Sequence, residues 1–240
     1  MASDYQTLKA DSLKDLFVKE IEAKIISGSL KPGDRLPPER DLASMMGISR
    51  GIVNSGILEL ASKGFVKIRP RKGTFVIDYN SEGTPHILSS IMNYNQGKLD
   101  IPLFLSMMDT RLLLEGECAR LAAVNRTNED LMELDRILNE YADESTNEPQ
   151  QIASLNYQFH HRITIASGNI IYAMIFKSFE PVCKNLIQMY FESEHIRSES
   201  IKQHRQLYKY IHDKNPEEAA GVMNEILMQG KNELLRLNAP

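Results

Sequence analysis

Residues 37–76 read PPERDLASMMGISRGIVNSGILELASKGFVKIRPRKGTFV, and their pattern changes at Gly64. Up to Gly64 they predict two helices joined by a short turn, because Pro37–Glu39 suits a helix start and Gly47 suits a helix end. After Gly64, apolar and basic residues alternate, a Pro-Arg-Lys-Gly turn follows, and a second apolar run returns, which predicts a β-hairpin. This order of helix, turn, helix and hairpin indicates a winged helix.

The rest of the chain predicts only helices. Residues 8–27 place apolar side chains three and four positions apart, which indicates one helix before the winged-helix stretch. Beyond residue 81 we find no convincing strand pattern and expect helices near 85–95, 101–124, 127–143, 149–167, 170–193, 196–213 and 216–237. The expected fold is therefore mostly α: an N-terminal winged helix-turn-helix with a small β-hairpin wing, and a C-terminal all-α bundle of about seven helices. We predict a winged-helix domain over 1–78, a linker over 79–85 and a helical domain over 86–240.

Charge is unevenly distributed along the chain. The net charge of the whole chain is −4, but residues 1–78 carry 13 Lys and Arg against 10 Asp and Glu, a net of +3, and the remainder carries 15 against 22, a net of −7. Five basic residues and no acidic residue lie between Glu59 and Asp78. This asymmetry favours a basic nucleic-acid-binding domain joined to an acidic domain. A solvated basic loop would also explain the basic residues between Glu59 and Asp78.

Composition excludes several classes of protein. Hydrophobic residues make up 42% and charged residues 25%, which is typical of a globular chain rather than a disordered one. The longest uncharged apolar stretch, 163–176, is shorter than the roughly 20 residues that a membrane span needs. The N-terminus lacks a secretory signal pattern, so we expect a cytoplasmic protein without a membrane partner. Cys118 and Cys183 are isolated and are expected to be buried thiols.

Several of these segments resemble one family of bacterial regulators. Residues 37–76 resemble the winged-helix domain of the GntR family in their Pro-x-Glu-Arg-x-Leu-Ala helix start, Gly-x-Ser-Arg turn and Gly-Thr-Phe-Val wing. RLLLEGECARLAA (111–123), NYQFHHRITIASGN (156–169) and KQHRQLYKYIHDKNPEEAA (202–220) resemble the all-helical effector domain of its FadR-like subgroup. The resemblance implies a homodimeric transcription regulator, more often a repressor, that binds a double-stranded DNA operator and a small-molecule effector, either an organic acid or an acyl-CoA.

Chemistry and resemblance agree on the residues that would contact DNA. Arg50 lies at the amino end of the expected recognition helix, where an arginine can pair with guanine, and Ser49 caps that helix near phosphate. Asn54 stands where the family usually has an arginine, and asparagine favours adenine. Arg40 matches another family arginine near the operator, or it pairs with a neighbouring carboxylate. The expected DNA-binding residues are Arg40, Ser49, Arg50, Gly51, Asn54, Arg71, Lys72 and Gly73.

The helical domain departs from the family's metal site. Many relatives hold a metal with Asp-x-x-x-His on one helix and two further histidines, and the resemblance places Asn156, His160, His204 and Ile226 at these positions. Two of the four ligands are missing, so His160 and His204 are candidates either for a weak zinc or nickel site or for hydrogen-bonded core residues.

A carboxylate effector would have an arginine available in the same domain. Arg111 matches a family arginine near the pocket and could bind a carboxylate, or it could form an ion pair with Glu115. The expected effector site therefore consists of Arg111, Asn156, His160 and His204. No cofactor beyond a metal is implied.

The alternative function is a helical metal-dependent enzyme. It rests on Glu192-x-x-His195, which matches one element of a di-iron carboxylate site. Such a site needs two of these elements and two more glutamates, and the sequence offers one element. We therefore expect no catalytic residues and no enzymatic activity.

Overall fold

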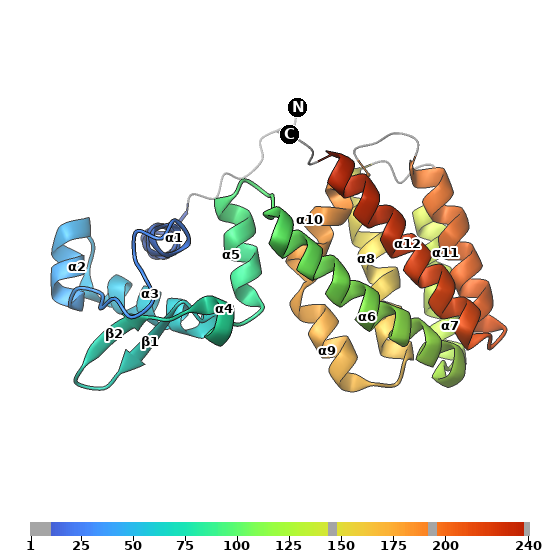
Figure 1. Ribbon diagram of the computed structural model, residues 1–240, viewed down its shortest axis with the longest axis horizontal. Coiled ribbons are helices and arrows are strands. Elements are labelled where there is room, and N and C mark those ends of the chain that lie inside the picture. The colour runs from blue at the N-terminus through green and yellow to red at the C-terminus, as the bar shows by residue number, and fades with distance from the viewer. Residues whose placement is uncertain (1–10, 144–147, 192–195, 238–240) are drawn as a thin grey trace, which may run out of the picture. The chain divides into compact units, whose positions relative to one another are not determined.

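The computed structural model describes residues 11–143, 148–191 and 196–237 and divides into two compact units, Met1–Lys98 and Leu99–Pro240 (Figure 1). The first unit contains α1 (Leu13–Ile26), α2 (Glu39–Met46), α3 (Arg50–Lys63), β1 (Val66–Arg69), β2 (Gly73–Val76), α4 (Tyr79–Glu82) and α5 (His86–Tyr94). The second contains α6 (Ile101–Asn125), α7 (Asn128–Ala142), α8 (Pro149–Ala166), α9 (Ile170–Ser178), α10 (Glu180–Tyr190), α11 (Ile196–His212) and α12 (Pro216–Leu237).

Local signals produce the helix-turn-helix and its wing. Gly47 ends α2 in the left-handed conformation, and the Ser49 side chain accepts a hydrogen bond from the backbone N–H of Ile52, which caps α3. Strands β1 and β2 then pair as an antiparallel hairpin, with Val66 opposite Val76. The predicted fold class, a winged helix followed by a helical bundle, is confirmed.

The second unit holds seven helices in its described part, but they are not the seven that the sequence predicts. The predicted helix 85–95 corresponds to α5, which packs against α1 in the first unit. The predicted helix 170–193 is wrong, because α9 and α10 are separate and meet at Phe179. Pro181 lies in the first turn of α10, where its ring and missing N–H prevent a continuous helix.

The limits of the compact units differ from the predicted domain limits. The expected linker, 79–85, includes the short helix α4, and the division between the units falls after Lys98. The assignment of DNA binding to residues 1–78 and of effector binding to residues 86–240 concerns function and stays a prediction. Both cysteines are free and buried, as predicted. No helix in the described ranges is long and apolar enough to cross a membrane.

The core of the second unit positions its pocket. Apolar side chains from α6, α7, α8, α11 and α12 form one cluster, in which Leu134, Phe159 and Leu207 are fully buried. Helix α12 packs along α6 (Figure 1). The polar residues expected to bind the effector lie on α6, α8 and α11, so the same packing that builds the core brings them together.

Candidate DNA interface and effector pocket

The amino end of α3 presents the expected base-reading residues to solvent. Arg50 is the first residue of α3, and Ser49, Arg50 and Gly51 are all exposed. The Ser49 side chain uses its oxygen to cap the helix, which leaves its hydroxyl hydrogen free to donate to a phosphate. Free backbone N–H groups and the helix dipole favour an anion at the same point. This end of α3 has the chemistry that the sequence predicts for a DNA contact.

Asn54 and Arg40 are exposed but already have partners. The side-chain amide of Asn54 donates a hydrogen bond of 3.1 Å to Glu39 Oε1, which connects α3 to the start of α2. Arg40 Nε lies 3.5 Å from Asp41 Oδ1, and the Arg40 side chain is 83% exposed. Solvent-exposed contacts of this kind are weak, so both side chains can exchange them for contacts with DNA.

The tip of the wing holds a basic residue in an unusual backbone conformation. Arg71 has φ 61°, and the N–H of Lys72 donates to the carbonyl oxygen of Arg69, which closes a tight turn with Pro70 at its second position. Glycine or asparagine is usual at the position of Arg71, because a side chain there is strained. An exposed arginine at this point can contact phosphate or the minor groove.

Gly73 has a structural role in the wing. Its φ is 111°, and a Cβ atom at this position would lie 2.7 Å from Nε of Arg35. A side chain here would be strained by this backbone conformation and would displace the guanidinium of Arg35. The predicted contact of Gly73 with DNA stays a prediction.

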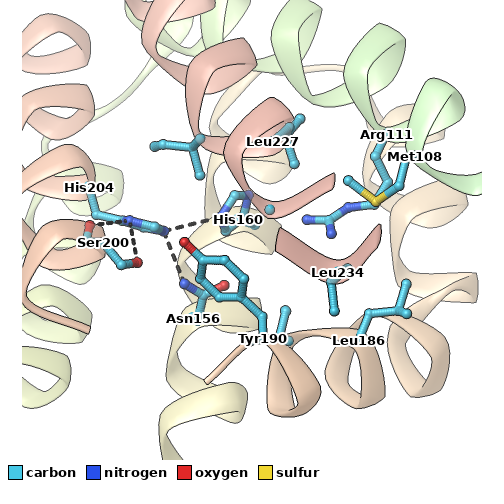
Figure 2. Close-up of a pocket in the computed structure, with 13 residues that line it drawn as sticks. Met108, Arg111, Asn156, His160, Leu186, Tyr190, Ser200, His204, Leu227 and Leu234 are labelled. Carbon is cyan, nitrogen blue, oxygen red and sulfur yellow. Dashed lines mark hydrogen bonds between the residues drawn. The ribbon is translucent and has the colours of Figure 1, made fainter. Parts of the chain in front are cut away.

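A cavity of about 40 Å³ lies among α6, α8, α10, α11 and α12 in the second unit (Figure 2). All four predicted effector residues line it, together with two hydroxyl-bearing residues that the sequence did not single out; the polar lining is Arg111, Asn156, His160, Tyr190, Ser200 and His204. The apolar lining is Met108, Leu186, Ile187, Ile226, Leu227 and Leu234. The structure therefore brings the whole predicted effector site together.

Arg111 reaches into this cavity while one of its nitrogens is held by Glu115. Arg111 Nε lies 2.6 Å from Glu115 Oε1, and the two side chains are 7% and 0% exposed. Burial alone would raise the pKa of Glu115, but the charges of Arg111 and His160 outweigh burial and lower it to about 2. Within the described part of the chain only Nε of this guanidinium makes a hydrogen bond. Figure 2 shows its outer nitrogens directed into the pocket.

His160 links that ion pair to His204. His160 Nδ1 lies 2.5 Å from Glu115 Oε2, and its Nε2 lies 3.2 Å from Nε2 of His204. His204 Nδ1 donates to the carbonyl oxygen of Ser200 at 2.6 Å, so its Nε2 carries a lone pair in the neutral ring. Burial is the main reason that the pKa of His204 falls to about 3, and His204 is therefore neutral.

Hydrogen bonds connect the polar groups of the cluster. Asn156 Nδ2 also faces His204 Nε2, at 3.1 Å, and acts there as a donor. The outer nitrogens of the Arg111 guanidinium differ, because they make no hydrogen bond with any residue that the structure describes. These charged donors favour an anion in the cavity.

The donor set does not fit a tightly held metal ion. The Nε2 atoms of His160 and His204 face one another, but the third candidate is the neutral amide of Asn156, and Ile226 is apolar. Zinc sites use at least three good protein ligands. Among the residues that the structure describes, no group of three or more His, Cys, Asp or Glu side chains could hold a metal ion. The enzyme candidate pair Glu192 and His195 lies outside the described residues.

Comparison with known proteins assigns a family to each of two segments of the chain. Residues 15–76 match the family described as "Bacterial regulatory proteins, gntR family", and residues 106–229 match the family described as "FCD domain". The chain belongs to the GntR family of transcription regulators with an FCD effector domain. Members of this group are regulators and not enzymes, as the sequence predicts. The GntR regulators bind DNA operators, and they bind small-molecule effectors through the FCD domain.

The curated relatives are named as regulators of different processes. The chain is 26% identical to the fatty acid metabolism regulator protein of Shewanella frigidimarina over 85% of this chain and 83% of the relative. It is 27% identical to the Uxu operon transcriptional regulator of Escherichia coli, over 89% of this chain and 83% of the relative. The Glc operon transcriptional activator of Escherichia coli is also 27% identical, over 84% and 81%.

Solved structures support the fold. The Listeria monocytogenes protein Lar, described as controlling the expression of the agr system and mediating virulence, aligns with a TM-score of 0.69 and 20% identity over 96% of this chain and all of that chain. Streptococcus agalactiae GntR aligns with a TM-score of 0.51 and 23% identity, over 92% of this chain and 99% of that chain. At this level of identity, the likeness shows the fold alone.

Proposed function

We propose that the protein is a homodimeric repressor that binds an inverted-repeat operator and changes its operator affinity when a small organic acid enters the pocket. One observation carries this proposal: the guanidinium of Arg111 is buried and reaches into a cavity of the effector domain. A carboxylate would form charge-assisted hydrogen bonds with its outer nitrogens. These hydrogen bonds to a charged donor would offset part of the cost of removing that carboxylate from water.

The pocket favours a small acid over an acyl-CoA. Arg111 is the one Arg or Lys among its described lining residues. The phosphates of CoA would need several basic partners, and residues 79–240 carry a net charge of −7. A cavity of about 40 Å³ also has room for only about three water molecules. A compact ligand with one carboxylate matches both observations.

The DNA-binding surface suits a dimer on a two-fold operator. A helix-turn-helix places one recognition helix in one half-site, and two copies related by a two-fold axis read two half-sites about one helical turn apart. The resemblance to the GntR family, whose members are more often repressors, is the basis for proposing repression.

Native mass spectrometry of the protein with its selected duplex tests the proposal. We expect two chains per duplex and, after dialysis, no stoichiometric zinc or nickel, because two imidazoles and an amide hold such ions weakly. One chain per duplex would contradict the dimer. Stoichiometric metal that resists dialysis and is released by His204→Ala would make the pocket metal-dependent and Asn156 a ligand. A retained organic acid would identify the effector directly.

Asn54 should give this protein its own operator preference. Asn54→Arg should shift the preferred base toward guanine at one position of each half-site, because an arginine pairs with guanine O6 and N7 whereas asparagine pairs with adenine. The change also removes the hydrogen bond to Glu39, which is exposed and contributes little. Selection from a randomised duplex library with both proteins measures the shift. Identical consensus sequences would mean that Asn54 contacts the backbone or Glu39 and not a base.

A further inference from the structure

We infer that the effector is a short-chain aliphatic monocarboxylate and that Gly230 on α12 limits the length of its chain. This inference rests on the proposed carboxylate site and adds the chemistry of the remainder of the ligand. It depends on two observations: the apolar character of the cavity beyond Arg111, and the open space beside Gly230.

The polar groups beside His204 are already engaged with one another. Ser200 accepts a hydrogen bond of 2.8 Å from the hydroxyl of Tyr141, and His204 uses both ring nitrogens. Asn156 donates to His204. Apart from one that reached the Tyr190 hydroxyl, hydroxyl groups on a ligand would therefore have to break existing hydrogen bonds or remain unpaired, which is unfavourable in a buried site.

The wall of the pocket opposite His204 and Ser200 is apolar. Leu186, Leu234 and Met108 lie across the cavity from His204 and Ser200 (Figure 2). Leu227 adds a further apolar side chain from α12. A methylene chain that leaves the carboxylate at Arg111 would bury its surface against these residues. This arrangement favours an alkanoate over a polyhydroxylated acid.

Gly230 leaves room where any other residue would place a side chain. It lies inside the 22-residue helix α12, where glycine is less favourable than alanine, and it lines the cavity. A Cβ atom at Gly230 would meet nothing within 4 Å, so packing does not require glycine there. Gly116 on α6 differs, because its Cβ would lie 2.7 Å from Oδ1 of Asn224. The space at Gly230 is therefore available to a ligand.

Binding of straight-chain monocarboxylates to the full-length protein, measured by calorimetry, tests this inference. Acetate, propionate, butyrate and hexanoate should bind the wild-type protein with affinity that rises about fourfold per methylene until the space is filled. 3-Hydroxypropionate has as many non-hydrogen atoms as butyrate, with a hydroxyl in place of the terminal methyl group, and should bind at least tenfold more weakly than butyrate. Operator affinity, measured by fluorescence anisotropy, should change in the same order.

Substitutions in α12 test whether the alkyl chain of the ligand ends beside Gly230. Gly230→Ala should shorten the preferred alkanoate by about one methylene, and Gly230→Leu should reduce the affinity for every alkanoate at least tenfold. Gly221→Ala is the matched control, because Gly221 is exposed in the same helix and its added Cβ also meets nothing within 4 Å. It should leave ligand binding unchanged. The far-ultraviolet circular dichroism spectra of all three variants should match that of the wild type, which shows that they fold.

The outcomes separate this inference from the function on which it rests. If 3-hydroxypropionate binds as tightly as butyrate, or if Gly230→Leu binds the alkanoates like the wild type, the inference is overturned while the carboxylate site stands. If neither the alkanoates nor 3-hydroxypropionate binds the wild-type protein or alters its operator affinity, both the carboxylate site and the inference are wrong.

Discussion

Arg111→Ala should lower the free energy of unfolding by about 3 kcal/mol or more. Glu115 is fully buried, and its Oε1 would lose the Arg111 partner at 2.6 Å. His160 would remain as its other partner, which places the expected loss at the lower end of the range for a broken buried ion pair. Chemical denaturation of the variant and the wild type measures the difference.

A surface pair on the same helix provides the control. Arg120 and Glu117 are three residues apart on α6, with their closest side-chain nitrogen and oxygen at 2.8 Å and side chains 36% and 38% exposed. Solvent screens this pair, so Arg120→Ala should change the free energy of unfolding far less than Arg111→Ala does. If Arg111→Ala is no more costly than Arg120→Ala, the pair of Arg111 and Glu115 is not held as the structure places it.

A double substitution separates the stability of the domain from its response to ligand. Arg111→Met together with Glu115→Gln leaves no buried charge in place of the pair, and the new amide oxygen can still accept a hydrogen bond from His160. Most of the lost stability should therefore return. The response of operator affinity to butyrate should not return, because the guanidinium that binds the carboxylate is absent. A double variant that responds to butyrate like the wild type would place the carboxylate elsewhere.

The same pair shows how far the sequence could predict the site. The spacing of Arg111 and Glu115 indicates an ion pair within one helix, and the resemblance to the family places His160 in the same domain. The contact between Glu115 and His160 joins residues 45 positions apart. No local pattern encodes it, because it depends on how α6 packs against α8. The hydrogen bonds of the cluster could therefore be found only from the structure.

Helix limits were predictable where a capping residue or a turn marked them. Ser49 and Thr127 begin helices with their side chains as N-caps, as their positions in the sequence suggest. The break between α9 and α10 was missed because apolar residues continue across it, although Pro181 was a visible signal. The placement of α5 in the first unit depends on its contact with α1, which periodicity alone does not determine.

The sequence predicts the DNA-binding surface only in part, because contacts within the protein also determine how its residues are held. Residue type and position predict that Asn54 contacts a base, but its hydrogen bond to Glu39 becomes visible only when α2 and α3 are packed together. Arg71 carries a basic side chain in a backbone conformation that composition does not reveal. The sequence thus predicts which residues contact DNA. The structure shows the hydrogen bond that Asn54 would have to break and the backbone conformation that holds Arg71.

Arg50→Ala should remove about 1–3 kcal/mol of discrimination between the operator and other sequences, which is about 5- to 150-fold in relative affinity. Arg50 is exposed at the first turn of α3, where an arginine reaches the edge of a guanine while the helix start contacts phosphate. Fluorescence anisotropy with the selected operator and a scrambled duplex measures the ratio at one fixed salt concentration.

Lys72→Ala is the control for this prediction because Lys72 is exposed at the tip of the wing, where phosphate is the expected partner. This variant should weaken both duplexes to a similar extent and reduce the slope of log affinity against log salt by about 1. Arg50→Ala should instead weaken the operator much more than the scrambled duplex. Equal losses on the two duplexes would assign Arg50 to phosphate, and base discrimination would then have to come from another residue of α3 or from the wing.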